Sequence, residues 1–310
     1  MVSLVLISSL IAMSSSSWVI LWIFLEMNSL TLCGMMAKEL KKQTQMNQPV
    51  LLYLVAQISS SIILLISCTS MEKSMTTSTL CVLCLMMKSG SFPFHLWYLK
   101  AMEKLKMKMN SMKMAMTWQK ILPFFILPYF NIKLVIITMA LASMTIPIYK
   151  MKKNSSMKSI LILSSLNNNS WLMISTIMSY MSFSIYFLLY SVTLLITMNF
   201  MKDMKMKKFN LKKKMHESVM VIFNLGGIPP SMMFMGKFLI MMILIQSNIP
   251  KELLLVMMMM MCYFMYHYLW CTHSLMMNSP QKTQVINMQT HPWISSVIWI
   301  MSTMALLMTM

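Results

Sequence analysis

The side chains best suited to proton chemistry in this sequence are ionisable groups embedded in long apolar stretches. Glu26, Lys88 and Lys120 each lie about ten residues from either end of such a stretch, which is about 15 Å in a helix. A charge at this depth in a membrane costs several kcal/mol unless it is paired or hydrated, and lysine reaches the interface only from near a helix end. We therefore predict that these residues transfer protons; errors in the span boundaries and purely structural ion pairs are the alternatives.

A further candidate, Lys237, follows a predicted break in a long apolar stretch. The break lies at Gly226, Gly227, Pro229 and Pro230. Proline lacks an N–H donor and leaves upstream carbonyl groups unpaired, and such backbone is tolerated at membrane depth only inside protein or along a wet cavity. Broken helices beside a charge are typical of ion pathways. We predict that Lys237 transfers protons; a structural kink with an incidental lysine is the alternative.

His95 lies near the lysine-rich end of the stretch that holds Lys88. An imidazole changes charge near neutral pH, which suits proton uptake or release. A histidine beside aromatic residues is equally typical of an interfacial anchor, so both interpretations stay open. Glu103 and Glu252 are interpreted as loop or helix-end charges.

The order of one acid followed by bases suggests a mechanism. Burial disfavours the charged form of an acid or a base, and a nearby opposite charge favours it. Separating Glu26 from Lys88 therefore drives the lysine to release its proton. We predict a switchable pair, Glu26 and Lys88, that passes protons to Lys120 and Lys237.

Other kinds of site have weak support in the sequence. Met is abundant, with 47 residues, but it stands where Leu or Ile would serve in lipid, without the His or Cys spacing of a soft-metal site. Cys81 and Cys84 form a lone CxxC in an apolar segment and are interpreted as packing residues. The sequence has no catalytic triad, no phosphate-binding glycine loop and no facing histidines for haem. We predict no metal site and no cofactor-binding site in this chain.

The composition places the chain in a membrane. Of its 310 residues, 58% are hydrophobic and 11% are charged, well below the roughly 25% charged residues of soluble domains. All 26 basic residues are Lys, and the absence of Arg argues against nucleic acid as a partner. The longest polar stretch, at about 201–215, leaves no soluble domain. No basic leader or transit peptide precedes the first apolar stretch, so we expect that stretch to stay in the mature protein.

Apolar runs long enough to cross about 30 Å of hydrocarbon recur from end to end. We predict an all-α fold with a single transmembrane domain over 1–310, which is a polytopic, antiporter-like bundle of about eleven helices. The ninth helix, 216–247, is broken at the glycine and proline residues. The predicted crossings are 1–14, 17–37, 50–68, 77–98, 109–129, 132–149, 157–178, 181–201, 216–247, 252–273 and 292–310.

The lysines test this helix count, because positive residues concentrate in the short loops on the side where a membrane protein is made. Loops after the second, fourth, sixth and eighth crossings hold the lysine-rich stretches 38–42, 100–113, 150–158 and 202–214. Loops after the first, third, fifth and seventh hold only Lys73, with Lys133 at a helix start. The alternation predicts that the N-terminus and the lysine-rich loops share one side of the membrane.

Motifs around the candidate residues carry a family resemblance. They are Trp22 through Leu25-Glu26-Met27-Asn28; Met86-Met87-Lys88-Ser89-Gly90 through Pro93-Phe94-His95-Leu96-Trp97; Thr117-Trp118-Gln119-Lys120-Ile121-Leu122-Pro123; and Leu225-Gly226-Gly227-Ile228-Pro229-Pro230 with Gly236-Lys237. In this order and spacing they resemble the chain 2 family of NADH–ubiquinone oxidoreductase, the mitochondrially encoded antiporter-like subunits of respiratory complex I in animals. The resemblance spans most of the chain.

The resemblance implies a proton-translocating membrane-arm subunit of complex I, the NADH:ubiquinone reductase that moves protons. It implies that Glu26, Lys88, Lys120 and Lys237 line a hydrophilic axis, in a protein of the mitochondrial inner membrane whose N-terminus and lysine-rich loops lie on the matrix side. The implied partners are the other membrane-arm subunits and the phospholipids of that membrane. NADH, flavin, iron–sulfur clusters and quinone belong to the assembly, so no redox centre is expected in this chain.

Two positions depart from the family pattern. The family commonly has a His where this chain has Asn168, and an amide cannot titrate, so no proton transfer by that side chain is expected. The family usually has a Pro after the motif that holds His95, and this chain has Leu99 there.

Two other functions fit the same buried charges. A stand-alone cation/proton antiporter needs them as well, but it would not co-purify with a very large assembly. A purely structural assembly subunit would keep proton pumping intact when Lys120 is replaced by Met.

Overall fold

The computed structural model describes residues 1–15, 17–40, 48–69, 74–106, 109–130, 132–151, 157–204, 223–229, 231–247 and 251–277. Every regular element in these ranges is a helix, so the prediction of an all-α fold is confirmed. The chain divides into two compact units, Met1–Phe187 and Leu188–Met310, and each is described by itself.

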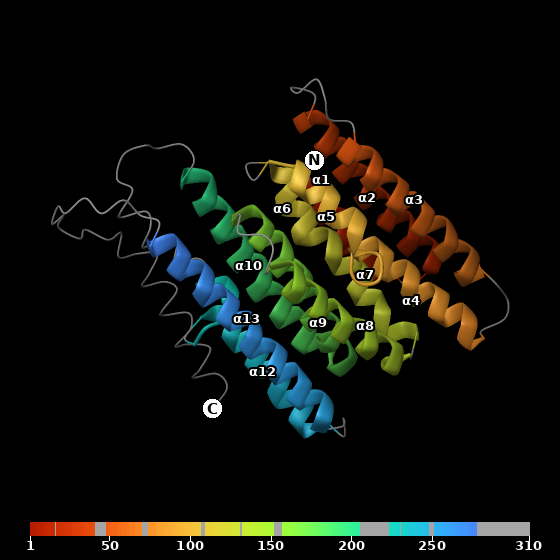
Figure 1. The fold of residues 1–310 in the computed structure, drawn as a ribbon. Helices are drawn as coiled ribbons and strands as arrows, with labels where there is room; N and C mark the ends of the chain where they lie inside the picture. The colour runs from red at the N-terminus through yellow and green to blue at the C-terminus, as the bar shows by residue number, and fades with distance from the viewer. Residues whose placement is uncertain are drawn as a thin grey trace. The chain divides into compact units, whose positions relative to one another are not determined.

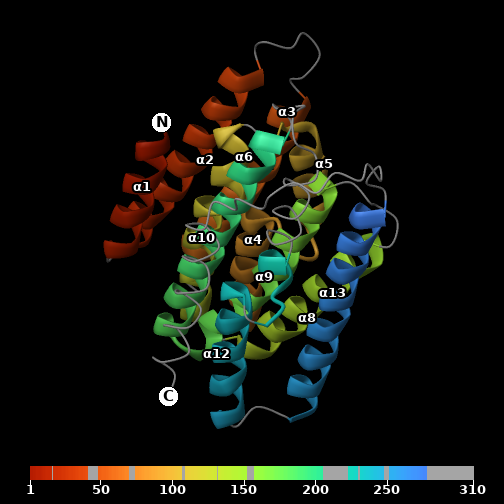
Figure 2. The same ribbon diagram turned by 90° about the vertical axis from the view of Figure 1, so that its left-hand side faces the viewer.

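The helices of the first unit are α1 (Val2–Ser14), α2 (Trp18–Leu40), α3 (Gln48–Thr69), α4 (Met75–Ser89), α5 (His95–Lys104), α6 (Asn110–Met116), the 3₁₀ turn η1 (Trp118–Lys120), α7 (Ile121–Ile126), the 3₁₀ turn η2 (Leu127–Phe130), α8 (Lys133–Met151) and α9 (Met157–Met178). Helix α10 (Tyr180–Met204) begins in this unit and continues into the second, which also holds α12 (Met232–Gln246) and α13 (Lys251–Met277). Within the first unit, α2, α3 and α4 lie side by side (Figures 1 and 2).

Five helices among the described residues are long and apolar enough to cross a membrane. They are Trp18–Leu40, Gln48–Thr69, Lys133–Met151, Tyr180–Asn199 and Glu252–Trp270. Shorter apolar helices are Val2–Ser14, Met75–Ser89 and Met232–Gln246. The structure therefore supports a multi-spanning membrane bundle, whereas the count of about eleven crossings is not confirmed. The predicted crossing 292–310 lies outside the described residues.

Helix α9 is buried on all sides, and it is rich in polar residues. Every residue from 159 to 176 is buried, and the helix packs against α5, α7 and α8. Its buried polar residues are Ser159, Ser164, Ser165, Asn167, Asn168, Asn169, Ser170, Ser175 and Thr176. By contrast, α3 exposes large apolar side chains such as Leu51, Val55 and Ile62, as expected of a helix that faces lipid. The first unit thus exposes apolar side chains on α3 and buries polar side chains on α9.

The stretch 77–98, which the hydropathy pattern predicts as one helix, forms two helices instead. Helix α4 ends at Ser89, Gly90 adopts a left-handed φ of 69°, and α5 begins only at His95. Glycine has no Cβ and takes this conformation at little cost, so it ends the helix. The prediction that Lys88 lies in the middle of a helix is therefore wrong, because Lys88 is the penultimate residue of α4.

The stretch 109–129 is likewise not a single helix. It consists of α6, η1, α7 and η2, and Thr117, at φ −113° and ψ −87°, interrupts the helical backbone. Pro123 lacks an N–H donor and is accommodated in the first turn of the short α7, where that donor has no intrahelical partner. Lys120 is the last residue of η1, so this lysine also lies at a helix interruption.

A third interruption lies in the second unit, inside the predicted stretch 216–247. Helical backbone covers residues 223–226, and Gly227 follows with a left-handed φ of 73°. Pro229 lies in the non-helical segment before α12 begins at Met232. Pro230 lies outside the described residues.

Candidate functional site

Glu26 of α2 and Lys88 of α4 form a buried ion pair. The Lys88 Nζ atom lies 2.8 Å from Glu26 Oε1, and the two side chains are 2% and 18% exposed. Burying two charges costs free energy that close contact largely offsets, but removing one partner leaves an uncompensated charge that costs about 3–5 kcal/mol. The protonation of each group therefore depends on the other.

The end of α4 determines how Lys88 is held. Because the helix stops at Ser89, no N–H group within the helix donates to its last carbonyl oxygens. The N–H groups of Gly90 and Ser91 donate to the carbonyl oxygens of Met87 and Met86 at 3.2 and 3.1 Å, which is a Schellman motif. The left-handed Gly90 thus closes the helix directly after the lysine.

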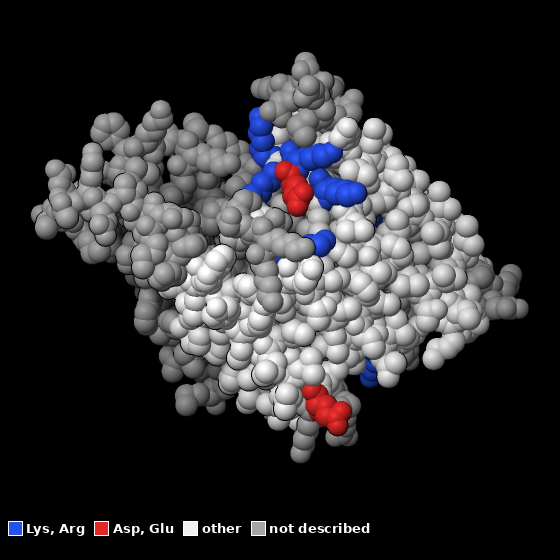
Figure 3. Space-filling view, viewed as in Figure 1, with Lys and Arg blue, Asp and Glu red and all other residues white. Residues whose placement is uncertain are grey.

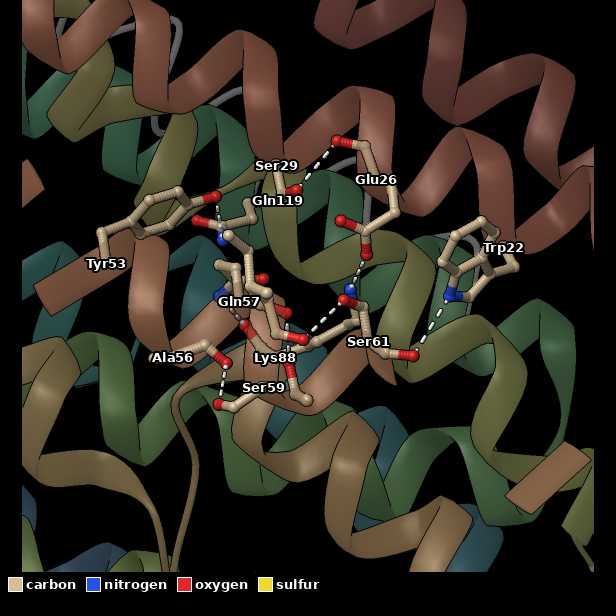
Figure 4. A network of polar contacts seen from close by, with 12 residues as sticks. Trp22, Glu26, Ser29, Tyr53, Ala56, Gln57, Ser59, Ser61, Lys88 and Gln119 are labelled. Carbon is tan, nitrogen blue, oxygen red and sulfur yellow. Dashed lines mark hydrogen bonds and ion pairs between the residues drawn. The ribbon is translucent and has the colours of Figure 1, made fainter. Parts of the chain in front are cut away.

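Side chains from two neighbouring helices satisfy the same end of α4. The Gln57 amide of α3 donates to the Lys88 carbonyl oxygen at 3.1 Å, and the Trp97 indole of α5 donates to the Met87 carbonyl oxygen at 3.2 Å. Figure 4 shows Glu26 and Gln57 approaching Lys88 from different helices. These two hydrogen bonds therefore join the end of α4 to α3 and α5 and fix the backbone at Lys88.

Lys120 lies in a different environment. Its side chain is 1% exposed, its Nζ atom donates to the Tyr98 hydroxyl at 3.2 Å, and it lies 4.6 Å from the centroid of the same ring. The Tyr98 hydroxyl also lies 2.7 Å from Ser165 Oγ on α9. In the part of the chain that the structure describes, Lys120 has hydroxyl and ring contacts and no carboxylate partner.

Tyr98 connects the two lysine sites. A Cβ atom placed on Gly90 would lie 2.7 Å from the Tyr98 Cβ atom, so the tyrosine packs directly on the glycine that ends α4. The Tyr98 hydroxyl then reaches Lys120 and Ser165. The residue that terminates the Lys88 helix is thus in contact with the residue that holds Lys120.

Polar groups continue along α9 beyond Ser165. Asn168 lies almost one turn further, and its Oδ1 atom accepts a hydrogen bond of 3.2 Å from the Tyr186 hydroxyl. The Asn168 Nδ2 atom and both amide atoms of Asn169 are buried without a hydrogen-bond partner in the described part of the chain. Buried amides of this kind are suited to bind water.

Lys237 lies in the second unit, on α12. It is 1% exposed, and a Cβ atom on Gly227 would lie 3.2 Å from its Nζ atom. The left-handed glycine of the helix break therefore provides the surface against which the amine rests. Gly226 similarly packs on Tyr268 of α13, whose Cδ2 atom would lie 3.0 Å from a Cβ atom at that position.

His95 begins α5 and lies beside a second base. Its Nε2 atom is 3.3 Å from Lys150 Nζ, and its Nδ1 atom is 3.3 Å from the Pro93 carbonyl oxygen. Glu103 is exposed near the other end of α5, and its carbonyl oxygen accepts a hydrogen bond from Lys158. Figure 3 shows lysine side chains gathered at one end of the visible face. The exposed Glu252 lies in the first turn of α13.

Sequence comparison decides the family. The profile described as "NADH:quinone oxidoreductase/Mrp antiporter, TM" matches residues 15–263, which is most of the chain. The chain belongs to this family of transmembrane proteins. The NADH-ubiquinone oxidoreductase chain 2 of Locusta migratoria is 28% identical over 265 residues, covering 80% of this chain and 76% of the relative. The family resemblance seen in the motifs is thereby confirmed.

Solved structures of family-like chains share the fold. A chain of the Mrp complex from Dietzia superposes with a TM-score of 0.72 at 13% identity, covering 86% of this chain and 58% of the Dietzia chain. A chain of respiratory complex I from Thermus thermophilus with bound NADH gives a TM-score of 0.66 at 8% identity, covering 93% and 70%. At these low identities, the superpositions show that the chains share a fold.

Several polar residues of the site escape sequence reasoning. Gln57, Tyr98 and Ser165 are neutral, and their contacts join positions 31 or 67 residues apart. Counting residues from the ends of an apolar stretch identifies charged residues only. One usable signal is present in α9, where the run Asn167-Asn168-Asn169 lies in the middle of a predicted membrane crossing and marks buried polar side chains.

The described residues also bear on metal binding. Within them, no group of three or more His, Cys, Asp or Glu side chains could hold a metal ion. Cys81, which the sequence pairs with Cys84 as a CxxC, has its Sγ atom 3.7 Å from that of Cys68. The absence of cofactor and metal sites from the whole chain stays a prediction.

Proposed function

We propose that this chain is a membrane-arm subunit of an NADH:ubiquinone oxidoreductase (complex I) and that it translocates protons along Glu26, Lys88, Lys120 and Lys237. The buried Glu26–Lys88 ion pair carries the proposal, because a charge pair in a membrane interior marks a proton or ion path. The names of its relatives and the complex I fold support membership of that assembly.

The same proposal includes the membrane location of the chain and its partners. It lies in the mitochondrial inner membrane as one multi-pass transmembrane domain, with the lysine-rich helix ends on the matrix side. Its partners are the other membrane-arm subunits and phospholipids. NADH, flavin, iron–sulfur clusters and quinone belong to other subunits, where electron transfer takes place.

The first step uses the ion pair as a switch. While Glu26 is charged and 2.8 Å away, it stabilises the ammonium form of Lys88. When Glu26 is neutralised or moves away, Lys88 becomes an unpaired charge at 2% exposure, and loss of its proton relieves that cost. The hydrogen bond from Gln57 holds the Lys88 backbone in place while the side chain changes partner.

The second step concerns Lys120. Tyr98 and Ser165 provide hydroxyl groups that both donate and accept hydrogen bonds, so they can relay a proton toward the polar face of α9. The buried amides of Asn168 and Asn169 suit water-mediated transfer, although Asn168 itself cannot titrate. Lys237, beside the break at Gly227, serves as the next base.

His95 is proposed to take up or release protons at the lysine-rich end. Its Nε2 atom lies 3.3 Å from Lys150 Nζ, and Lys150 lies in the last turn of α8, at the lysine-rich end. An imidazole can both take up and release a proton, which suits proton exchange with water at this place.

The test is proton pumping by the assembled complex in proteoliposomes. Lys120→Met is expected to lower the number of protons moved per NADH oxidised, because the base is gone. The matched control is Lys106→Met, which removes an exposed lysine. If Lys120→Met pumps as the control does, the chain is a structural subunit and the proposal fails.

A stand-alone cation/proton antiporter is the second candidate, because the family profile also covers Mrp antiporters. The size of the native assembly separates the two. A complex I subunit migrates in native gels with a very large NADH-oxidising complex, whereas a stand-alone antiporter migrates without it.

A further inference from the structure

A cavity of about 380 Å³ opens at the lysine-rich end of the first unit. Helices α5, α8 and α9 line it, and Tyr149 on its wall is 64% exposed. Of the residues of the proposed proton path, His95 borders this cavity through its contact with Lys150, and Glu26, Lys88, Lys120 and Lys237 are not among its lining residues. A half-open hollow between helices near a membrane interface is a place where a membrane lipid can bind.

The charged residues on the cavity wall favour an anion. Lys100 and Lys150 line the cavity, with Glu103 as the only acid among its described lining residues. Lys158 donates to the Glu103 carbonyl oxygen, which brings a further ammonium group to the rim. Ser159 adds a small polar group to the wall. The excess of lysine over acid therefore attracts a phosphate group.

The cavity also changes from polar to apolar with depth. Helix α5 runs outward toward Lys104, so Leu96 lies about 10 Å deeper than Glu103. Helix α9 runs inward from Met157, so Leu163 lies about 6 Å deeper than Ser159. Both helices thus place polar side chains at the outer end of the cavity and leucines at its inner end.

We infer that this cavity binds an anionic glycerophospholipid, with the headgroup phosphate at Lys100 and Lys150 and the start of an acyl chain against Leu96 and Leu163. A free phosphate ion would contact the lysines but not the leucines. A neighbouring subunit could fill an apolar groove, but the lysines would then need an acid from it. The polar-to-apolar order matches one phospholipid molecule, and it requires only that the chain lies in a membrane.

The test uses the whole assembled complex in phosphatidylcholine vesicles that contain a trace of phosphatidylglycerol with a photoactivatable acyl chain. After illumination, peptide mass spectrometry measures the lipid label on α5 and α8. Phosphatidylglycerol is expected to label these helices about fivefold more than equally photoactivatable phosphatidylcholine, since one lysine near the surface is worth about that factor for an anionic lipid. This comparison needs no variant, so it stands even if a variant fails to assemble.

Single substitutions test whether the labelled lipid lies in this cavity. Lys100→Gln is expected to lower labelling by phosphatidylglycerol about fivefold, while Lys106→Gln, which removes an exposed lysine outside the cavity, leaves it unchanged. Glu103→Gln is expected to raise labelling by phosphatidylglycerol, because Glu103 is the only acid among the described lining residues.

Four results would overturn the inference. Equal labelling by phosphatidylcholine would mean that the charge of the lipid does not matter. No phosphatidylglycerol label on α5 and α8 would mean that another subunit covers the cavity. Better labelling by photoactivatable phosphatidylethanolamine, with a loss in Glu103→Gln, would assign the cavity to a zwitterionic lipid. Displacement of the label by excess inorganic phosphate would assign it to the free ion.

Discussion

Lys88 and Lys120 are almost equally buried, at 2% and 1% exposure, but they differ in what stabilises their charge. Lys88 has the Glu26 carboxylate at 2.8 Å. Lys120 has the Tyr98 hydroxyl at 3.2 Å and the face of the same ring at 4.6 Å. A carboxylate compensates a buried ammonium charge far better than a hydroxyl and a ring do. The two buried lysines therefore differ in how well their surroundings compensate a positive charge.

The backbone around the two lysines differs in the same sense. Lys88 precedes a closed helix end, in which Gly90, Gln57 and Trp97 satisfy the terminal carbonyl groups. Lys120 lies in a short 3₁₀ turn between two short helices. A 3₁₀ turn within a helical stretch often marks a hinge or a strained segment. We expect the surroundings of Lys120 to rearrange more readily than those of Lys88.

The largest expected effect is the loss of the acid at the Lys88 site. Glu26→Ala leaves a buried ammonium without a partner, which is expected to cost about 3–5 kcal/mol in stability. Thermal inactivation of the assembled complex, and its amount on native gels, measure this loss. In the double variant Glu26→Gln with Lys88→Met no charge is buried, so stability is expected to recover while proton pumping stays low. Glu252→Ala, at an exposed helix end, is the control. A loss of stability in Glu26→Ala no larger than in Glu252→Ala would contradict the ion-pair argument.

The next effect tests the contact between the two sites. Gly90→Ala places a Cβ atom 2.7 Å from Tyr98 Cβ at a left-handed φ of 69°, and the steric overlap plus the backbone cost amount to about 3 kcal/mol. Because Tyr98 must move, we expect Lys120 to lose its hydroxyl contact and proton pumping to fall. Gly34→Ala is the matched control, since its Cβ atom would meet only the flexible end of Met1 at 3.3 Å. A loss of thermal stability no greater than in Gly34→Ala would show that Tyr98 does not rest on Gly90.

The sequence alone predicts the membrane class and the burial of Lys88, Lys120 and Lys237, for a simple physical reason. In a chain with 11% charged residues, a charge in a long apolar run stands out, and its depth can be counted along the chain. Helix α9, at Met157–Met178, has the bounds that the pattern predicts. Hydropathy suffices there because that helix has no glycine or proline to interrupt it.

Hydropathy does not predict the helix breaks that distinguish the lysine sites. A hydropathy average over a long window passes over the short polar segments around Gly90 and Thr117, where the backbone geometry interrupts the helices. Neutral partners such as Tyr98 are hidden for another reason. Its contact with Ser165 joins positions 67 residues apart, and nothing local in either segment marks it.

The smallest effect isolates the hydroxyl that distinguishes Lys120 from Lys88. Tyr98→Phe keeps the ring over Lys120 and removes one hydrogen-bond partner, so the stability loss is expected to be about 1 kcal/mol. On the proposed function, proton pumping should fall more than NADH oxidation does, because a proposed relay group is lost while electron transfer takes place in other subunits. The measurement is the proton-to-NADH ratio in proteoliposomes, with Tyr129→Phe, a tyrosine that is 59% exposed, as the control. An unchanged ratio in Tyr98→Phe would mean that the ring alone serves Lys120 and that protons leave this lysine by another route.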